Sequence, residues 1–161
     1  MEKKPKTNAC RLLDKAGIDY ELIGYEVDES NLAADHVADS LGEDINRVWK
    51  TIVLKGERKG YFVCVVPGNK EIDLKKAAKA IGDKKADLIA MKDLLPLTGY
   101  IRGGCSPVGM KKKFPTFFHK TATDYDTVFV SGGQRGLQIK ISSEKLIGYC
   151  DGIIVDLTTE E

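Results

Sequence analysis

The sequence has almost no excess of charge, since 25 basic residues stand against 24 acidic ones for a net charge of +1. Proteins that bind nucleic acid on their own usually carry a larger positive excess, because contacts with phosphate dominate their affinity. The balance therefore argues against a dedicated nucleic-acid-binding protein. Basic residues do gather locally in residues 75–85 and 111–113, which are either solvated surfaces or contacts to an RNA backbone.

The chain also has few residues suited to metal or redox chemistry. It contains two histidines, and its four cysteines form no CxxC pair; they are His36, His119, Cys10, Cys64, Cys105 and Cys150. Residues scattered in this way lack the spacing of zinc ligands, and we predict no metal and no other cofactor. We interpret the cysteines as reduced thiols of a cytoplasmic protein.

Long apolar runs are missing as well, and none is long enough to cross a bilayer. Residues 1–5 are mostly charged and no apolar segment follows them, so we expect no export signal and no membrane partner. The 161 residues are 42% hydrophobic and 30% charged. This composition suits one globular domain that spans residues 1–161.

Three segments have the spacing of a short amphipathic helix, with apolar residues three and four positions apart and a glycine directly after them. They are residues 9–16, 34–41 and 74–81, and a fourth helix is expected over residues 143–149. Asp73 is a candidate N-cap of the third helix, and Ser142 or Ser143 of the fourth.

Segments rich in β-branched and aromatic residues predict strands between these helices. They cover residues 20–25, 48–55, 61–66, 116–119, 127–130, 137–141 and 153–155. In the segment 137–141, apolar residues alternate with Gln138 and Lys140, which predicts one solvent-facing side. Helices and strands follow no regular βαβ order, so we predict an α+β fold around a mostly antiparallel or mixed sheet. Residues 91–102 have no clear pattern.

Two glycine-rich loops are the most specific local features. Three glycines and a proline fall within the seven residues Gly103-Gly104-Cys105-Ser106-Pro107-Val108-Gly109, and a second loop contains Ser131-Gly132-Gly133. Such composition is typical of a loop whose backbone lies close to another group. Neither loop has the spacing of a phosphate-binding P-loop or of a dinucleotide site.

Ser106 in the first loop is a candidate nucleophile. A nucleophile elbow needs glycine two residues to each side, and Val108 stands at the second of these positions. No motif around either histidine marks a general base. We therefore expect Ser106 to position a substrate through its hydroxyl or its amide.

Lys50 is the second unusual residue. In a strand it shares one face with Val48, Ile52 and Leu54, which are all apolar. A lysine in such a row either extends its ammonium to solvent at the sheet edge or points into a partly buried cavity. In a cavity it could meet a phosphate, a hydroxyl or a carbonyl oxygen of a ligand.

Several of these segments, in combination and in order, carry a resemblance to a known family. They are Val48-Trp49-Lys50-Thr51, residues 73–82, Thr98-Gly99-Tyr100, the loop 103–109 and residues 131–137. With them the chain resembles the YbaK/EbsC family of aminoacyl-tRNA deacylases, which are related to the editing domain inserted in bacterial prolyl-tRNA synthetases. The resemblance spans nearly the whole chain and is strongest to the branch that acts on Cys-tRNA(Pro).

The resemblance implies a compact domain with a curved, barrel-like mixed sheet, short helices around it and an open crevice. By likeness to the family, Lys50 is the residue essential for activity. The residues implied in binding the aminoacyl end of the substrate are Tyr25, Thr51, Gly103, Gly104, Ser106, Pro107, Gly109, Ser131 and Gly132. Cys105 stands where an aliphatic residue is usual, and we interpret it as an apolar filler.

The resemblance also implies a reaction. The protein would correct mischarged Cys-tRNA(Pro), and Cys-tRNA(Cys) is a second substrate left open. Its partners would be the acceptor end of tRNA and prolyl-tRNA synthetase, without DNA or a membrane. Ester cleavage proceeds either by attack of the substrate's own thiol, as in a lyase, or by an activated water, as in a hydrolase. Two alternatives remain open: a deacylase for another small amino acid, such as Ala-tRNA(Pro), and a binding module without catalysis.

Overall fold

The computed structural model describes residues 6–159, and it has the α+β architecture expected from the sequence. The charged start at residues 1–5, from which we expect no export signal, lies outside the described residues. Within the described part of the chain, no helix is both long and apolar enough to span a membrane.

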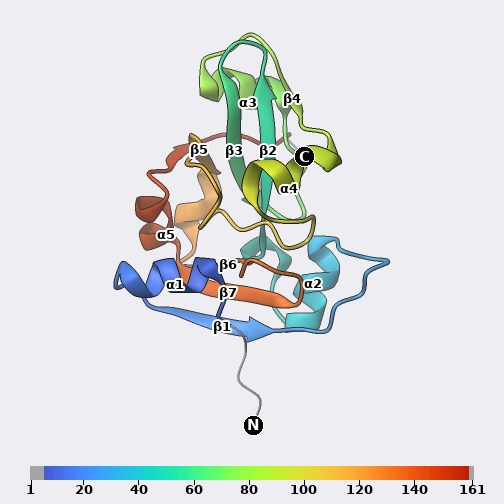
Figure 1. Ribbon diagram of the computed structural model, residues 1–161, viewed down its shortest axis with the longest axis vertical. Helices are drawn as coiled ribbons and strands as arrows, with labels where there is room; N and C mark the ends of the chain where they lie inside the picture. The colour runs from blue at the N-terminus through green and yellow to red at the C-terminus, as the bar shows by residue number, and fades with distance from the viewer. Residues whose placement is uncertain (1–5, 160–161) are drawn as a thin grey trace.

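The strands form two sheets (Figure 1). The three-stranded sheet is antiparallel and has the order β1 (Tyr20–Gly24), β7 (Leu137–Ser142), β6 (Thr127–Ser131). The five-stranded sheet has the order β4 (Ala86–Leu88), β2 (Trp49–Gly56), β3 (Gly60–Pro67), β5 (Thr116–His119), β8 (Ile153–Val155). It is mixed, because β3 pairs with β5 and β5 with β8 in parallel, while β2 pairs antiparallel with β3 and β4.

One bridge joins the two sheets where β2 begins. Val48 pairs with Phe129 of β6, and the next residue already belongs to the five-stranded sheet. In Figure 1 the β2–β3 hairpin rises vertically, and the three-stranded sheet crosses below it. The strands thus form a curved, barrel-like arrangement that does not close into a barrel.

The predicted helices are confirmed with small shifts at their ends. They are α1 (Asn8–Lys15), α2 (Ala34–Leu41), α3 (Leu74–Ile81) and α5 (Ser143–Tyr149). The side chain of Asp73 accepts the N–H groups of Lys75 and Lys76, and Ser142 caps α5. Residues 91–102, which have no clear pattern in the sequence, contain the helix α4 (Met91–Thr98), with Pro96 inside it. Two short 3₁₀ segments cover Ile45–Arg47 and Lys120–Asp124.

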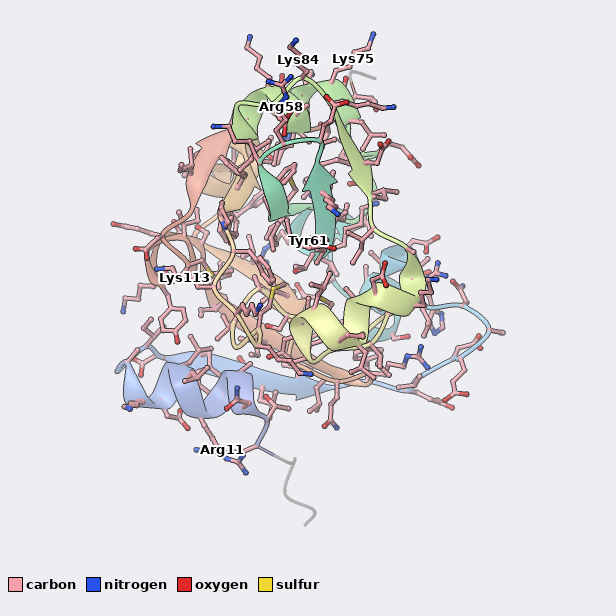
Figure 2. The ribbon with its side chains drawn as sticks, turned by 45° about the horizontal axis from the view of Figure 1, so that its top comes forward. Arg11, Arg58, Tyr61, Lys75, Lys84 and Lys113 are labelled. Carbon is pink, nitrogen blue, oxygen red and sulfur yellow. The ribbon has the colours of Figure 1, made fainter. Side chains whose placement is uncertain are left out.

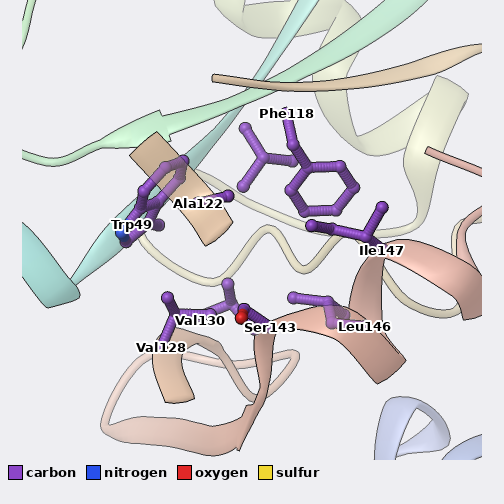
Figure 3. A pocket seen from close by; sticks show the side chains of 9 residues that line it. Trp49, Phe118, Ala122, Val128, Val130, Ser143, Leu146 and Ile147 are labelled. Atoms are coloured by element: carbon purple, nitrogen blue, oxygen red, sulfur yellow. The ribbon is translucent and has the colours of Figure 1, made fainter. Parts of the chain in front are cut away.

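The main core fills the space between the sheets and α5. Trp49, Phe118, Val128 and Leu146 meet there, together with other buried apolar side chains (Figure 3). The space that they enclose admits no water-sized molecule. The core is therefore closed to a ligand here, and a binding site must lie elsewhere.

The predicted solvent-facing side of β7 is wrong at Gln138, which is only 5% exposed. The reason is tertiary: Gln138 lies in the wall of a cavity that the start of β2 also lines, so other elements cover it. The start of β2 reaches this sheet through the bridge at Val48. A polar residue in an alternating pattern is thus buried here, where it faces a cavity.

Candidate active site

A cavity of about 480 Å³ lies beside the first residues of β2. Its walls come from the start of β2, from the segment before α2, from residues 68–72, from β4 and α4, and from both glycine loops. Four of the residues singled out from the sequence line it: Lys50, Thr51, Gly103 and Ser131.

Lys50 extends into this cavity, which decides between the two possibilities left open by the sequence. The side chain is half-buried, and burial lowers the pKa of its ammonium below the usual 10.5. The nearby carboxylate of Glu71, which also lines the cavity, acts in the opposite direction and favours the charged form. A partly dehydrated cation of this kind interacts strongly with an oxygen that gains negative charge.

Two buried oxygen atoms in the cavity wall have no hydrogen-bond partner among residues 6–159. They are Thr51 Oγ1 and Gln138 Oε1. Buried polar atoms are nearly always satisfied, and leaving one without a partner costs about 1–3 kcal/mol. Both atoms have almost no accessible surface, so they lie behind the cavity surface and the cost falls on the wall itself.

The two glycine loops pack directly against each other. A Cβ atom at Gly104 would lie 2.9 Å from the Cα of Gln134, so only glycine allows this approach. Arg135 Nε donates to the carbonyl oxygen of Arg102 at 2.8 Å and links the loops at the cavity rim. Gly103 adopts φ +84°, a conformation that strongly favours glycine, and it lines the cavity.

The second half of the first loop points away from the cavity. Ser106 is fully buried (0% exposed), and its Oγ accepts the N–H of Val108 at 3.2 Å. A Cβ at Gly109 would lie 2.7 Å from the hydroxyl of Tyr100, and the carbonyl of Pro107 accepts a weak bond from the Cys150 thiol. Ser106, Pro107 and Gly109 thus shape the loop from behind and do not line the cavity.

Tyr25 and Gly132 also lie behind the cavity wall. The Tyr25 N–H donates to the carbonyl of Gly136, and its ring packs on a small apolar cluster beside α2. The carbonyl of Gly132 accepts the hydroxyl of Thr7 at 2.6 Å, which ties the second loop to the start of α1. The structure therefore gives these two residues supporting positions.

Sequence reasoning missed three polar residues of the cavity, Gln138, Glu71 and Arg102. Gln138 was hidden by its alternating pattern, and Glu71 lies in a loop without any motif. Cys105 lines the cavity as well, and burial raises the pKa of its thiol to about 12. A thiol in that state is protonated at neutral pH, in agreement with an apolar filler.

The remaining cysteines and His119 are also internal. All four cysteines are buried and free. His119 Nδ1 accepts the N–H of Leu157 at 3.1 Å, and its Nε2 lies 3.3 Å from the hydroxyl of Thr158. Within residues 6–159, no three His, Cys, Asp or Glu side chains are grouped so that they could hold a metal ion.

Comparison with known proteins identifies the family of the chain. The model of a family described as the aminoacyl-tRNA editing domain matches residues 29–149. The chain belongs to the aminoacyl-tRNA editing domain family. The matched segment contains the start of β2 with Lys50 and both glycine loops, which confirms the resemblance seen in the sequence.

Individual relatives agree with this assignment. The chain is 45% identical over 156 residues to a protein of Enterococcus faecalis with the provisional name Cys-tRNA(Pro)/Cys-tRNA(Cys) deacylase EbsC, covering 97% of this chain and 95% of that protein. It is 36% identical over 78 residues to proline–tRNA ligase of Fervidobacterium nodosum, covering 48% of this chain and 13% of the ligase.

A solved structure confirms the fold. The crystal structure of a protein described as a candidate trans-editing enzyme for prolyl tRNA synthetase superposes with a TM-score of 0.84. The two chains are 23% identical, and the superposition covers 99% of this chain and all of the other. At that identity the similarity supports the fold and nothing further.

Proposed function

We propose that this protein is an aminoacyl-tRNA deacylase that acts in trans on Cys-tRNA(Pro), with Cys-tRNA(Cys) as a second substrate. The observation that carries the proposal is Lys50, a half-buried cation in a cavity of about 480 Å³ that two glycine loops border. The name of the Enterococcus relative supports the choice of amino acid. As a protein of translation, it would work in the cytoplasm beside prolyl-tRNA synthetase.

The cavity offers groups for both polar parts of an aminoacyl ester. The carboxylate of Glu71, which lines the cavity, suits the α-ammonium of the amino acid, which has only donors. The Lys50 ammonium suits the ester carbonyl, whose oxygen becomes negative in the transition state. Donors placed in this way contribute about 3–4 kcal/mol to catalysis.

The main-chain donors of the first glycine loop are fewer than its composition suggests. The Gly104 N–H donates to the carbonyl of Ile101 at 2.9 Å and is therefore engaged in the turn. The N–H groups of Gly103 and Cys105, two residues that line the cavity, donate no such bond among the described residues and are left as loop donors for the oxyanion. In this proposal Lys50 supplies most of the charge stabilisation.

The nucleophile in this proposal belongs to the substrate. The cysteine thiol attacks its own ester carbonyl, a sulfur–carbon bond forms, and the carbon–oxygen bond to the ribose breaks. The thiol proton ends on the ribose oxygen, so the products are tRNA and a thiolactone. An intramolecular attack has a large advantage once the reactive conformer is held.

This chemistry explains selectivity that size alone cannot supply. Cysteine and proline differ so little in volume that one binding pocket discriminates between them weakly. A reaction that needs a thiol leaves Pro-tRNA(Pro) intact, because proline has none. Alanine, serine and proline esters would then be stable although each fits the cavity.

A deacylation panel with the purified protein tests the proposal. We expect rapid release of cysteine from Cys-tRNA(Pro), and little release of alanine, serine or proline from the same tRNA. Rapid seryl release would indicate an activated water in place of the thiol, and preferential alanyl release would assign the other specificity. Binding of the charged tRNAs without turnover would support a module without catalysis.

Lys50→Ala is the matching variant, with Lys55→Ala as its control on the same strand. Lys55 is exposed, faces the other side of β2 and lies over the ring of Tyr61. We expect the first change to lower kcat by about 100-fold or more, and the second to leave it within about twofold of the wild type. Near wild-type rates for Lys50→Ala would remove this lysine from the mechanism.

A further inference from the structure

Six exposed basic side chains gather at one end of the protein, where three segments meet. The segments are the turn of the β2–β3 hairpin, the exposed side of α3 and the link from α3 to β4 (Figure 1). We call this set the basic end; it consists of Arg58, Lys59, Lys75, Lys79, Lys84 and Lys85. Figure 2 shows Arg58, Lys75 and Lys84 together at this end, far from Arg11.

Asp83 holds the two turns of the basic end in place. Its Oδ2 accepts the backbone N–H groups of Arg58 and Lys59, each at 2.8 Å, and its Oδ1 accepts that of Lys84 at 2.7 Å. These bonds keep the pKa of Asp83 below its usual range. Gly56 makes room for the carboxylate, since a Cβ there would lie 2.6 Å from Oδ2. The central anion is thus engaged by main-chain amides, and the basic side chains around it extend to solvent.

The cations of the basic end have no ion-pair partner among residues 6–159. The carboxylates of Glu57 and Asp87 are nearby in the sequence, and neither forms a salt bridge within the described chain. The basic cluster at residues 111–113 differs, because Lys113 pairs with Asp151. Of the two clusters seen in the sequence, the basic end is therefore the stronger candidate for binding an external anion.

Strand β4 connects the basic end with the cavity. It starts one residue after Lys85, and its last residue, Leu88, lines the cavity together with Met91. These two apolar side chains are 56% and 58% exposed, so both are accessible to a ligand. From Lys50 to Gly56 at the hairpin turn, six strand steps span about 20 Å.

We infer that the basic end binds the sugar–phosphate backbone of the tRNA acceptor stem. The unpaired 3′ end would then run along β4, with its bases over Leu88 and Met91, and place the ester in the cavity. The distance agrees, because a few unpaired nucleotides at about 3.4 Å each when stacked, and more when extended, put the duplex on the order of 15–25 Å from the ester. The inference rests on the proposed function for the position of the ester, but the binding surface can be tested without any reaction.

The test uses an uncharged RNA hairpin that has the acceptor-stem duplex and a single-stranded CCA end. Its affinity is measured by fluorescence anisotropy at several salt concentrations. The variant is Arg58→Ala/Lys84→Ala, and the control is Arg11→Ala/Lys15→Ala, which removes the same two residue types from the exposed surface of α1. All four side chains are exposed and outside the cavity, so both variants should fold.

We expect the basic-end variant to raise the Kd about tenfold, and to lower the slope of log Kd against log salt concentration by about 2. The control should change neither quantity. Equal effects of the two variants, or none, would overturn the inference. A fold-change that persists with a single-stranded CCA oligonucleotide would also overturn it, because the duplex would then not be the group recognised. If the RNA binds as expected while no aminoacyl ester is cleaved, the proposed function fails and the binding surface stands.

Discussion

Substitution of Gly104 by alanine tests whether the contact between the two glycine loops is as close as the structure shows. The added methyl group would meet three backbone atoms, the Cα and carbonyl carbon of Gln134 and the nitrogen of Arg135, at 2.9–3.1 Å. Backbone atoms cannot move aside as the end of a flexible side chain can. The loops must therefore separate by several tenths of an ångström.

The expected destabilisation follows from two opposing effects. Forcing an extra methyl group into a packed site costs about 1–3 kcal/mol. Replacement of glycine by alanine also restricts the unfolded chain, which offsets about 0.4–1 kcal/mol. Gly104 does not have a positive φ, so no backbone strain adds to the cost. We expect a net loss of about 1–2 kcal/mol in the free energy of unfolding.

Urea denaturation measures this loss, and Gly148→Ala is the matched control. Gly148 lies in α5, and a Cβ added there would have no atom within 4 Å, so alanine should stabilise the protein by about 0.5–1 kcal/mol. The two glycine-to-alanine changes should thus move the urea midpoint in opposite directions. If Gly104→Ala unfolds at the same urea concentration as the wild type or a higher one, the proposed loop contact is wrong.

Three further predictions concern ionisable groups. Glu71→Gln should move the alkaline limb of kcat/KM against pH to lower pH, because loss of the carboxylate lowers the pKa of Lys50 further; an unmoved limb would show that Glu71 does not act on it. Burial lowers the pKa of His119 below its usual 6.5 in the folded protein. As the pH falls below 6.5, the unfolded chain therefore binds a proton more readily than the folded protein does, and the free energy of unfolding declines. Between pH 7 and pH 5 the urea midpoint should fall less in His119→Gln than in the wild type. The glutamine amide oxygen can still accept the N–H of Leu157, so the variant removes only the titration. Equal declines in the two proteins would contradict this role of His119. The Cys105 thiol, with a pKa of about 12, should react with iodoacetamide at pH 8 far more slowly in the native protein than in urea, and mass spectrometry of the labelled peptide reports the difference.

The sequence was sufficient for features that depend on local chemistry. Helix α3 begins after Asp73 and ends before Gly82, because a carboxylate caps the first amides and glycine adopts the left-handed conformation at the end. Lys50 was conspicuous because a charged residue interrupts an apolar row. Both signals lie within a few neighbouring positions, where propensity and periodicity are informative.

Features that depend on tertiary neighbours could not be predicted in the same way. Gln138 was expected at the surface, since nothing local shows that other elements would cover it in the wall of a cavity. Helix α4 was hidden because Pro96 cannot donate the helical hydrogen bond at its position. The sequence also did not show that the second half of the first loop points away from the cavity. A serine such as Ser106 gives no local signal of whether its hydroxyl contacts a ligand or accepts the N–H of Val108.

The pairing of β1 with β7 has a consequence for synthesis of the chain. Tyr20 pairs with Ile141, so the first strand has no partner until the chain has been made as far as β7. At about 5–20 residues per second, β1 waits on the order of ten seconds, with the side chains of Leu22 and Ile23 uncovered. The β2–β3 hairpin can form in that interval, because its contacts are local. In the nascent chain, the β2–β3 hairpin should therefore become resistant to protease early. Strand β1 should become resistant late and in one step.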